Sequence, residues 1–145
     1  MRILGIDYGD VRVGLAVCDM GETLASGIGT VTISGMRDAV KKITAVCDER
    51  QIEAIVLGLP LNMDGSEGAS ASKIRAFADM LNLAMPQMPI ELYDERRTSI
   101  LAADYMSETG TYGAKRKKSV DTLSAEIILQ SRLDREKNRK AREGS

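Results

Sequence analysis

Residues 1–19 (MRILGIDYGDVRVGLAVCD) restrict the possible folds more than any other stretch of the chain. Two apolar runs with alternating character are separated by a short turn at Gly9 and Asp10, and this pattern predicts a β-hairpin. The first run ends at Asp7 and the second at Asp19. The chain therefore begins with two antiparallel strands, and its fold must contain a sheet.

Asp7 is the first candidate functional residue. In an extended strand its side chain lies on the same face as Gly5, which leaves room beside it. A carboxylate at the end of an apolar strand is costly to bury unless it is paired or binds a cation. The alternative is an ordinary turn residue, because aspartates at strand ends often accept hydrogen bonds from the backbone that follows. The hairpin alone leaves both interpretations open.

The composition indicates one globular domain. The chain has 145 residues, of which 43% are hydrophobic and 28% charged, as is usual for a domain with its own core. We find no apolar run near the roughly 20 residues of a membrane helix and no signal-peptide pattern. Cys18 and Cys47 lie far apart in apolar contexts, which favours buried thiols in a reducing compartment. We expect a cytoplasmic protein without a membrane partner, either a monomer or a homodimer.

The absence of histidine excludes several kinds of site. Ser-His-Asp and Cys-His nucleophile systems, histidine acid–base catalysis and Cys/His zinc sites all need that residue. An enzyme of this composition would have to use carboxylates, lysines, hydroxyls or a bound hard metal ion. A ligand set made only of oxygen favours magnesium or manganese.

Charge is distributed unevenly along the chain. Residues 1–114 hold 10 basic and 16 acidic side chains, whereas residues 115–145 hold 10 basic and 5 acidic ones. A basic segment after an acidic body indicates either a polyanionic partner or a solvated terminal helix, and the pattern does not choose between them.

The order of apolar runs predicts the element order β-β-β-α-β-α-β-α-α. Strands are expected within 1–19 and at 24–33, 53–59 and 90–93, and helices at 35–50, 69–84, 100–106 and 119–133, before a charged tail at 135–145. Three consecutive strands followed by two α/β crossovers predict a mixed sheet with helices on both faces. In such a sheet the functional crevice lies outside the carboxyl ends of the parallel strands. Asp7, residues 58–60 and residues 94–95 all fall at such ends.

Glu95 and Asp121 join Asp7 as candidate site residues. Each has an ordinary alternative, because Glu95 could form a surface ion pair with an arginine and Asp121 could favour the dipole at a helix start. The small residues Ser124 and Ala125 would let the last helix approach the sheet closely and turn Asp121 toward Asp7. Three carboxylates at one edge could hold hard cations, and a pair of such ions can activate water and stabilise the leaving oxygen of a phosphodiester.

Four segments, in this order, resemble the YqgF/RuvX family of RNase H-like nucleases: GIDYGDVRVGLAVCD, VLGLPLNMDGSEG, LYDERRTS and SVDTLSAEIILQSRLD. The similarity ends at about residue 134, so we expect a nuclease domain at 1–134 and a charged tail at 135–145. It implies an RNase H-like α/β fold with a five-stranded mixed sheet, three antiparallel strands and then two parallel ones, flanked by helices on both faces. Ser99 and Ser124 stand where the family commonly has threonine and alanine, and neither change removes an acid.

The resemblance also implies that Asp7, Glu95 and Asp121 are the catalytic, metal-binding acids, with one or two Mg²⁺ or Mn²⁺ ions. Members of the family are described as nucleases that mature the 5′ end of pre-16S ribosomal RNA, and also as Holliday junction resolvases. We expect nucleic-acid contacts from basic and hydroxyl residues near the acids, namely Arg12, Arg96, Arg97, Thr98, Lys115, Arg116, Lys117 and Lys118. Such cations would contact phosphates and would not read sequence.

Three functions are compatible with the sequence. The favoured one is a metal-dependent endonuclease that acts on structured RNA, such as precursor ribosomal RNA. The second uses the same chemistry to resolve branched DNA in recombination and repair. The third is a non-catalytic RNA-binding or ribosome-associated factor that uses only the basic C-terminal region.

Overall fold

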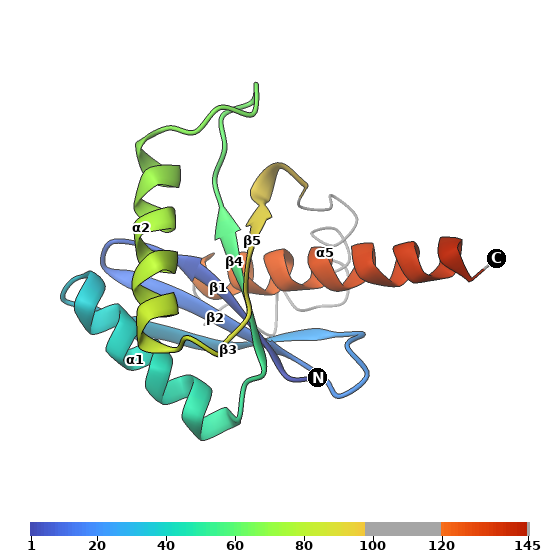
Figure 1. The fold of residues 1–145 in the computed structure, drawn as a ribbon, viewed down its shortest axis with the longest axis horizontal. Coiled ribbons are helices and arrows are strands. Elements are labelled where there is room, and N and C mark those ends of the chain that lie inside the picture. The colour runs from blue at the N-terminus through green and yellow to red at the C-terminus, as the bar shows by residue number, and fades with distance from the viewer. Residues whose placement is uncertain (98–119, 145) are drawn as a thin grey trace.

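The computed structural model describes residues 1–97 and 120–144 (Figure 1). Five strands form the sheet: β1 (Ile3–Tyr8), β2 (Arg12–Cys18), β3 (Ala25–Thr32), β4 (Ala54–Leu59) and β5 (Ile90–Asp94). The described helices are α1 (Met36–Arg50), α2 (Ala69–Ala84), the 3-10 turn η1 (Glu95–Arg97) and α5 (Val120–Glu143). The helix predicted at 100–106 lies outside the described residues.

The sheet has the strand order β3-β2-β1-β4-β5. β2 pairs antiparallel with β1 and with β3, whereas β4 pairs parallel with β1 and with β5. This arrangement confirms the predicted mixed sheet. Short turns produce the antiparallel part, while α1 and α2 are the crossovers that return the chain to the same end of the sheet. The carboxyl ends of β1, β4 and β5 therefore lie at one edge.

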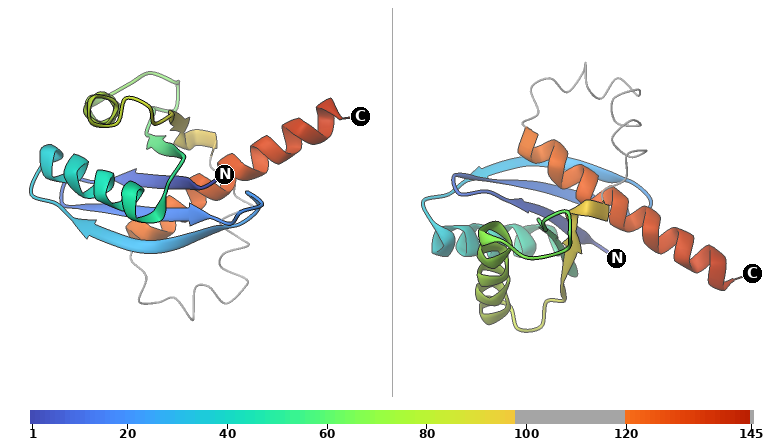
Figure 2. Two further views of the ribbon diagram at one scale, coloured as in Figure 1. Left: turned by 60° about the horizontal axis from the view of Figure 1, so that its bottom comes forward. Right: turned by 90° about the horizontal axis from the view of Figure 1, so that it is seen from above.

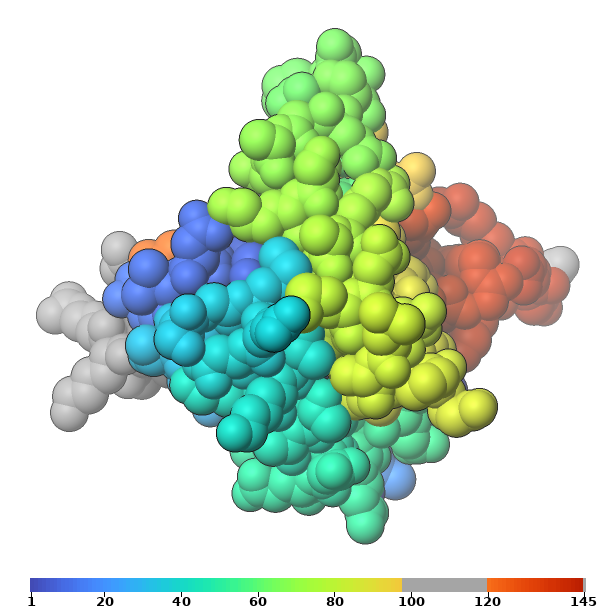
Figure 3. Space-filling model, turned by 60° about the vertical axis from the view of Figure 1, so that its left-hand side comes forward, coloured from blue at the N-terminus to red at the C-terminus, as the bar shows by residue number. Residues whose placement is uncertain are grey.

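Helices cover both faces of the sheet, as predicted (Figure 2). α1 and α2 pack side by side on one face (Figure 3), and α5 crosses the other face over β3, β2, β1 and β4. The alternation along β1 separates two cores, because Leu4 and Ile6 face α1 and α2 while Ile3 faces α5. α5 packs closely against β1 at Gly5, where an added Cβ would lie 2.8 Å from the Cβ of Leu129.

α5 is longer than predicted, since it continues past residue 133 to Glu143, through most of the segment expected to be a tail. Leu133, 3% exposed, is its last buried residue. Beyond it, Arg139 forms ion pairs with Glu136 and Glu143, one helical turn away on either side, which support the projecting end seen in Figure 1. None of the helices in residues 1–97 and 120–144 combines the length and the apolar character needed to cross a membrane.

β3 is an edge strand whose free backbone groups are covered by side chains of α5. Glu126 accepts a hydrogen bond from the Gly27 N–H at 2.6 Å. Gln130 accepts one from the Ala25 N–H at 2.9 Å and donates another to the Thr23 carbonyl at 2.9 Å. These side chains occupy backbone groups that an uncovered edge would leave open to a further strand.

Candidate active site

The start of α5 lies directly on β2, because β2 has a glycine at the point of contact. Gly14 is paired in register with Asp7 of β1. An added Cβ at Gly14 would lie only 2.0 Å from the carbonyl oxygen of Asp121, so no other residue allows this approach without moving the helix. Asp7 and Asp121, far apart in the sequence, are thereby brought to the same corner of the sheet.

Glu95 reaches this edge from β5. It is the first residue of η1, and it lies over Gly58 near the end of β4. An added Cβ at Gly58 would lie 3.2 Å from Oε1 of Glu95 and 2.6 Å from Cδ1 of Ile128 of α5. The missing side chain therefore leaves space for both. Because Ile128 belongs to α5, the Glu95 carboxylate lies on the same face of the sheet as Asp7 and Asp121.

Two of the three carboxylates, Asp7 and Glu95, are partly desolvated and lie near other negative charges. The pKa of Asp7 is raised to about 7, first by burial and then by the negative charges of Glu95 and Asp121. The pKa of Glu95 is also raised, by burial and then by the charge of Asp94. Burial and like charges both disfavour the ionised form, so a bound cation would stabilise these groups.

The donor set fits a hard metal ion by its chemistry, since all its ligands are carboxylate oxygens. As the side chains lie, no three acidic or cysteine residues within 1–97 and 120–144 are close enough together to hold one ion. Asp121 is bound by Arg12 instead, whose Nε lies 3.2 Å from its Oδ2. An ion bound through Oδ2 of Asp121 would compete with Arg12 for that oxygen.

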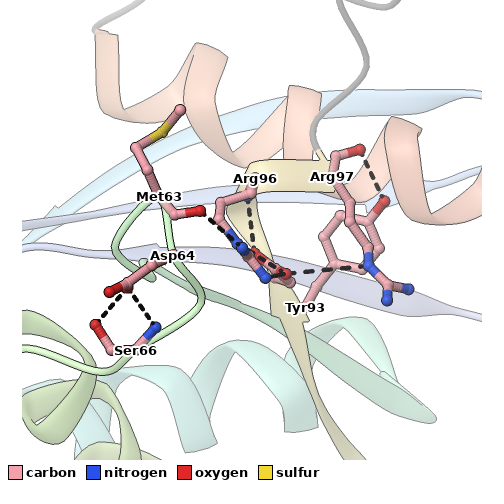
Figure 4. Close-up of polar contacts among 7 residues, drawn as sticks. Met63, Asp64, Ser66, Tyr93, Arg96 and Arg97 are labelled. Carbon is pink, nitrogen blue, oxygen red and sulfur yellow. Dashed lines mark hydrogen bonds and ion pairs between the residues drawn. The ribbon is translucent and has the colours of Figure 1, made fainter.

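The basic residues predicted to bind nucleic acid differ in their exposure and in how strongly other protein groups bind them. The side chains of Arg12 and Arg97 are 59% and 53% exposed. The side chain of Arg96 is held in place, because its guanidinium binds the carboxylate of Asp94 and the carbonyl of Met63 (Figure 4). Thr98 and the basic run at residues 115–118 lie outside the described residues.

Two features of the site are missed by the sequence interpretation. The role of Gly14 has a visible signal, a glycine in the middle of an apolar strand, which often marks a close approach of another backbone. The role of Asp94 is less visible. Its position directly before Glu95 and Arg96 allows an Asx turn, in which it accepts a hydrogen bond from the Arg96 N–H at 2.9 Å.

Within residues 1–97 and 120–144, the candidate site lies at the edge of the sheet where β1 and β5 end and α5 begins. A pocket of about 660 Å³ lies elsewhere, between the start of β1 and the second half of α5, with Ile3, Leu133 and Lys137 in its lining. The three acids do not line it.

Comparison with solved structures shows the fold. The structure of Thermus thermophilus RuvC in complex with a Holliday junction substrate matches with a TM-score of 0.64 and 14% identity, over 95% of this chain and 96% of that one. The predicted RNase H-like fold is thereby confirmed.

Comparison with known sequences shows the family. A relative from Caldanaerobacter subterraneus is 39% identical over 95% of this chain and 99% of its own length, and one from Clostridium novyi is 40% identical over 92% and 98%. Both bear the name "Putative pre-16S rRNA nuclease". The model of the RuvX family, whose description is "Holliday junction resolvase", matches residues 1–135. The chain therefore belongs to the RuvX family.

Proposed function

We propose that the chain is a metal-dependent endonuclease that cuts phosphodiester bonds in structured RNA and matures the 5′ end of pre-16S ribosomal RNA. The observation that carries the proposal is that the fold brings Asp7, Glu95 and Asp121, from three distant segments, to one corner of the sheet, where the charges of Glu95 and Asp121 act on Asp7. The names of the relatives supply the substrate. Free thiols at Cys18 and Cys47 agree with a reducing compartment such as the cytoplasm.

In this proposal Asp7, Glu95 and Asp121 hold one or two Mg²⁺ or Mn²⁺ ions. When bound, such ions lower the pKa of a water molecule and stabilise the charge on the leaving oxygen. Asp7 contributes most as a ligand when it is ionised, and in the absence of a cation its pKa is raised to about 7, first by burial and then by the negative charges of Glu95 and Asp121. Because the chain has no histidine, its acids and their cation carry the chemistry.

Basic residues around the edge would hold the substrate backbone. Arg12 and Arg97 are exposed beside the acids, and the chain has four consecutive cations at residues 115–118, shortly before Asp121. We include Thr98 in this set because it directly follows Arg97. Contacts of this kind neutralise phosphates and make affinity fall steeply with salt, without selecting a base sequence.

Cleavage of a defined RNA tests the proposal. The wild-type protein with Mn²⁺ or Mg²⁺ should cut a transcript that spans the 5′ end of pre-16S RNA, and chelation should stop it. Asp7→Asn should lower the rate by at least about 100-fold, more than the loss of an outer-shell partner usually costs. Asp79→Asn, which removes an exposed carboxylate of α2, is the matched control and should cut normally. Equal activity in the Asp7 and Asp79 variants would overturn the assignment of the site.

Resolution of four-way DNA junctions is the second candidate, and the description of the family model favours it. A junction resolvase cuts two strands symmetrically and so needs two copies of the site in one assembly. Parallel assays on a mobile four-way junction and on the RNA transcript, with the oligomeric state measured by light scattering, separate the two. Faster cleavage of the junction by a dimer would favour DNA, whereas cleavage of only the transcript would favour RNA. Binding of RNA without any cleavage would indicate a non-catalytic factor instead.

A further inference from the structure

Arg96 joins two loops at the edge that carries Glu95. Its Nε and Nη2 donate to the carboxylate of Asp94, with Nη2 2.8 Å from Oδ2. Its Nη1 donates to the carbonyl of Met63 at 3.2 Å, in the loop between β4 and α2 (Figure 4). One guanidinium thus connects the turn after β5 with the loop after β4.

The turn that contains Glu95 is fixed at both ends. On one side, Asp94 Oδ1 accepts a hydrogen bond from the Arg96 N–H at 2.9 Å, which encloses Glu95 in an Asx turn. On the other side, the hydroxyl of Tyr93, which is 2% exposed, donates to the carbonyl of Arg97 at 3.3 Å. These contacts set the backbone of Glu95, and therefore the direction of its side chain over Gly58.

The loop on the other side of Arg96 is also ordered by its own contacts. Asp64 accepts hydrogen bonds from the backbone N–H and the hydroxyl of Ser66. Gly65 has a φ of +88°, and an added Cβ there would lie 3.5 Å from the guanidinium nitrogens of Arg96. The guanidinium therefore lies against the tip of this loop as well as hydrogen bonding to it.

These contacts argue against Arg96 as a direct phosphate ligand. The charge of its guanidinium is balanced by Asp94, whose pKa is lowered by the hydrogen bond from Arg96. Arg97, the next residue, is more exposed, and its Nε lies 4.0 Å from the nearest oxygen of Asp94. Of these two neighbouring arginines, Arg97 is the more weakly held by Asp94 and the better placed to bind a substrate phosphate.

We propose that Arg96 is a positioning residue for Glu95: with Asp94 it clips the β4–α2 loop onto η1 and so fixes the direction of the Glu95 carboxylate. The inference rests on the proposed function only in taking Glu95 as a metal ligand. An arginine fork is required for this role, because one side chain must bind a carboxylate and a carbonyl at the same time. Lysine keeps the charge but cannot reproduce that geometry.

Arg96→Lys is the direct test, and Arg75→Lys is its matched control. Arg75 also forms a two-pronged pair with a carboxylate, that of Glu67, but it does not contact η1. In hydrogen exchange, Arg96→Lys should speed exchange in peptides covering residues 60–68 and 93–97, whereas Arg75→Lys should leave 93–97 unchanged. In calorimetric titration with Mn²⁺ alone, Arg96→Lys should weaken binding by roughly 10- to 100-fold, the usual effect of losing an outer-shell partner. Arg75→Lys should bind Mn²⁺ as the wild type does.

Kinetics distinguish positioning from phosphate binding. Positioning predicts that Arg96→Lys lowers kcat roughly 10- to 100-fold with little change in KM. A phosphate contact predicts instead a raised KM in Arg96→Met that lysine largely restores. Asp94→Asn should reproduce the effect of Arg96→Lys on Mn²⁺ affinity, and the double variant should be no worse than either single one.

The outcomes separate this inference from the proposed function. If hydrogen exchange and Mn²⁺ affinity are unchanged in Arg96→Lys, the positioning role of Arg96 is overturned, even if the wild type cuts RNA. If the wild type binds Mn²⁺ but cuts no nucleic acid, the proposed function fails. The hydrogen-exchange and titration results then still decide whether Arg96 positions Glu95. If Arg96→Lys alters exchange but Mn²⁺ affinity and kcat stay at wild-type values, Arg96 is structural only and the positioning role is rejected.

Discussion

Arg12 Nε lies 3.2 Å from Oδ2 of Asp121, so the first residue of β2 holds a carboxylate in the first turn of α5. The pair places a positive charge directly beside one of the proposed metal ligands. Both side chains are partly exposed, which limits the strength of the interaction to about 0.2–1 kcal/mol. Arg12 is therefore a weak competitor of the cation at Asp121.

Replacing Arg12 should tighten metal binding in the absence of nucleic acid. Arg12→Met removes the competing charge, and a loss of up to about 1 kcal/mol of competition corresponds to an affinity gain of up to about five-fold. Calorimetric titration with Mn²⁺ measures the change. Weaker Mn²⁺ binding in Arg12→Met would show that Arg12 supports the site and does not compete for it.

Asp7→Asn should stabilise the metal-free fold while it abolishes cleavage. The pKa of Asp7 in the folded chain is about 7 against an ordinary value of 3.8, so the folded state binds the proton more tightly than the unfolded state does. This carboxylate therefore destabilises the fold fully above about pH 7, and the penalty disappears as the pH falls toward 4. Part of the carboxylate stays in water, which weakens the effect. Asp7→Asn should therefore raise the free energy of unfolding at pH 8 by about 1–2 kcal/mol.

Thermal melts in EDTA at pH 5 and pH 8 measure this effect. The melting temperature of Asp7→Asn should exceed that of the wild type at pH 8, and the difference should shrink at pH 5. Asp79→Asn, on the exposed side of α2, should show no such pH-dependent difference. A lower melting temperature for Asp7→Asn at pH 8 would mean that the carboxylate is stabilised in the folded state.

The sequence predicts where Asp7 and Glu95 lie relative to the sheet better than it predicts the contacts that bring Asp121 near them. Hairpin alternation and strand ends are local signals, and they correctly place Asp7 and Glu95 at the same edge of the sheet. The close contact of Asp121 with β2 depends on Gly14, whose effect appears only when a helix from the far end of the chain lies on it. A single glycine in a strand has several ordinary meanings, so its partner cannot be read from local pattern.

The contacts of Arg96 and the length of α5 are also not predictable from local sequence pattern. The sequence shows that Arg96 follows Glu95. It does not show that the Arg96 guanidinium binds Asp94 and the Met63 carbonyl, because Met63 is 33 residues away along the chain. The helix extension beyond Leu133 has no apolar stripe to predict it. Its support comes from pairs such as Arg139 with Glu143, which a charge-rich tail could also contain.

Gly14→Ala should destabilise the fold and displace Asp121. The added methyl group would meet backbone atoms of Asp121 and Thr122 at 3.0 Å or less, and backbone cannot turn aside as a side chain can. We expect a loss of about 3 kcal/mol, the upper end for an overpacked core. Urea denaturation measures it, with Gly21→Ala as control, because the nearest atom there is the Thr23 hydroxyl at 3.4 Å. Equal midpoints for the two variants would contradict the close approach of α5.

Gln130→Met should weaken the contact between α5 and the β3 edge. The substitution keeps the length of the side chain but leaves the Ala25 N–H and the Thr23 carbonyl without their partner. Of these two groups the Ala25 N–H is buried, and a buried group left unsatisfied costs about 1–3 kcal/mol. Urea denaturation provides the value, and Asn138→Met, at an exposed position of the same helix, should change it by less than about 0.5 kcal/mol. Similar stabilities of the two variants would show that the edge is not held by Gln130.

Truncation after Asp134 tests the proposed end of the nuclease domain. Leu133 and Gln130 remain in that chain, and the part removed contributes mainly ion pairs, those of Arg139 with Glu136 and Glu143 and that of Glu136 with Arg132. Such pairs are weak, so the free energy of unfolding should fall only slightly, as urea denaturation measures. A chain ending at Leu129 is the control, and it should lose several times as much because it lacks the buried Leu133. If the 1–134 chain fails to fold while the full chain is stable, the projecting end of α5 is part of the domain, and the boundary at residue 134 is wrong.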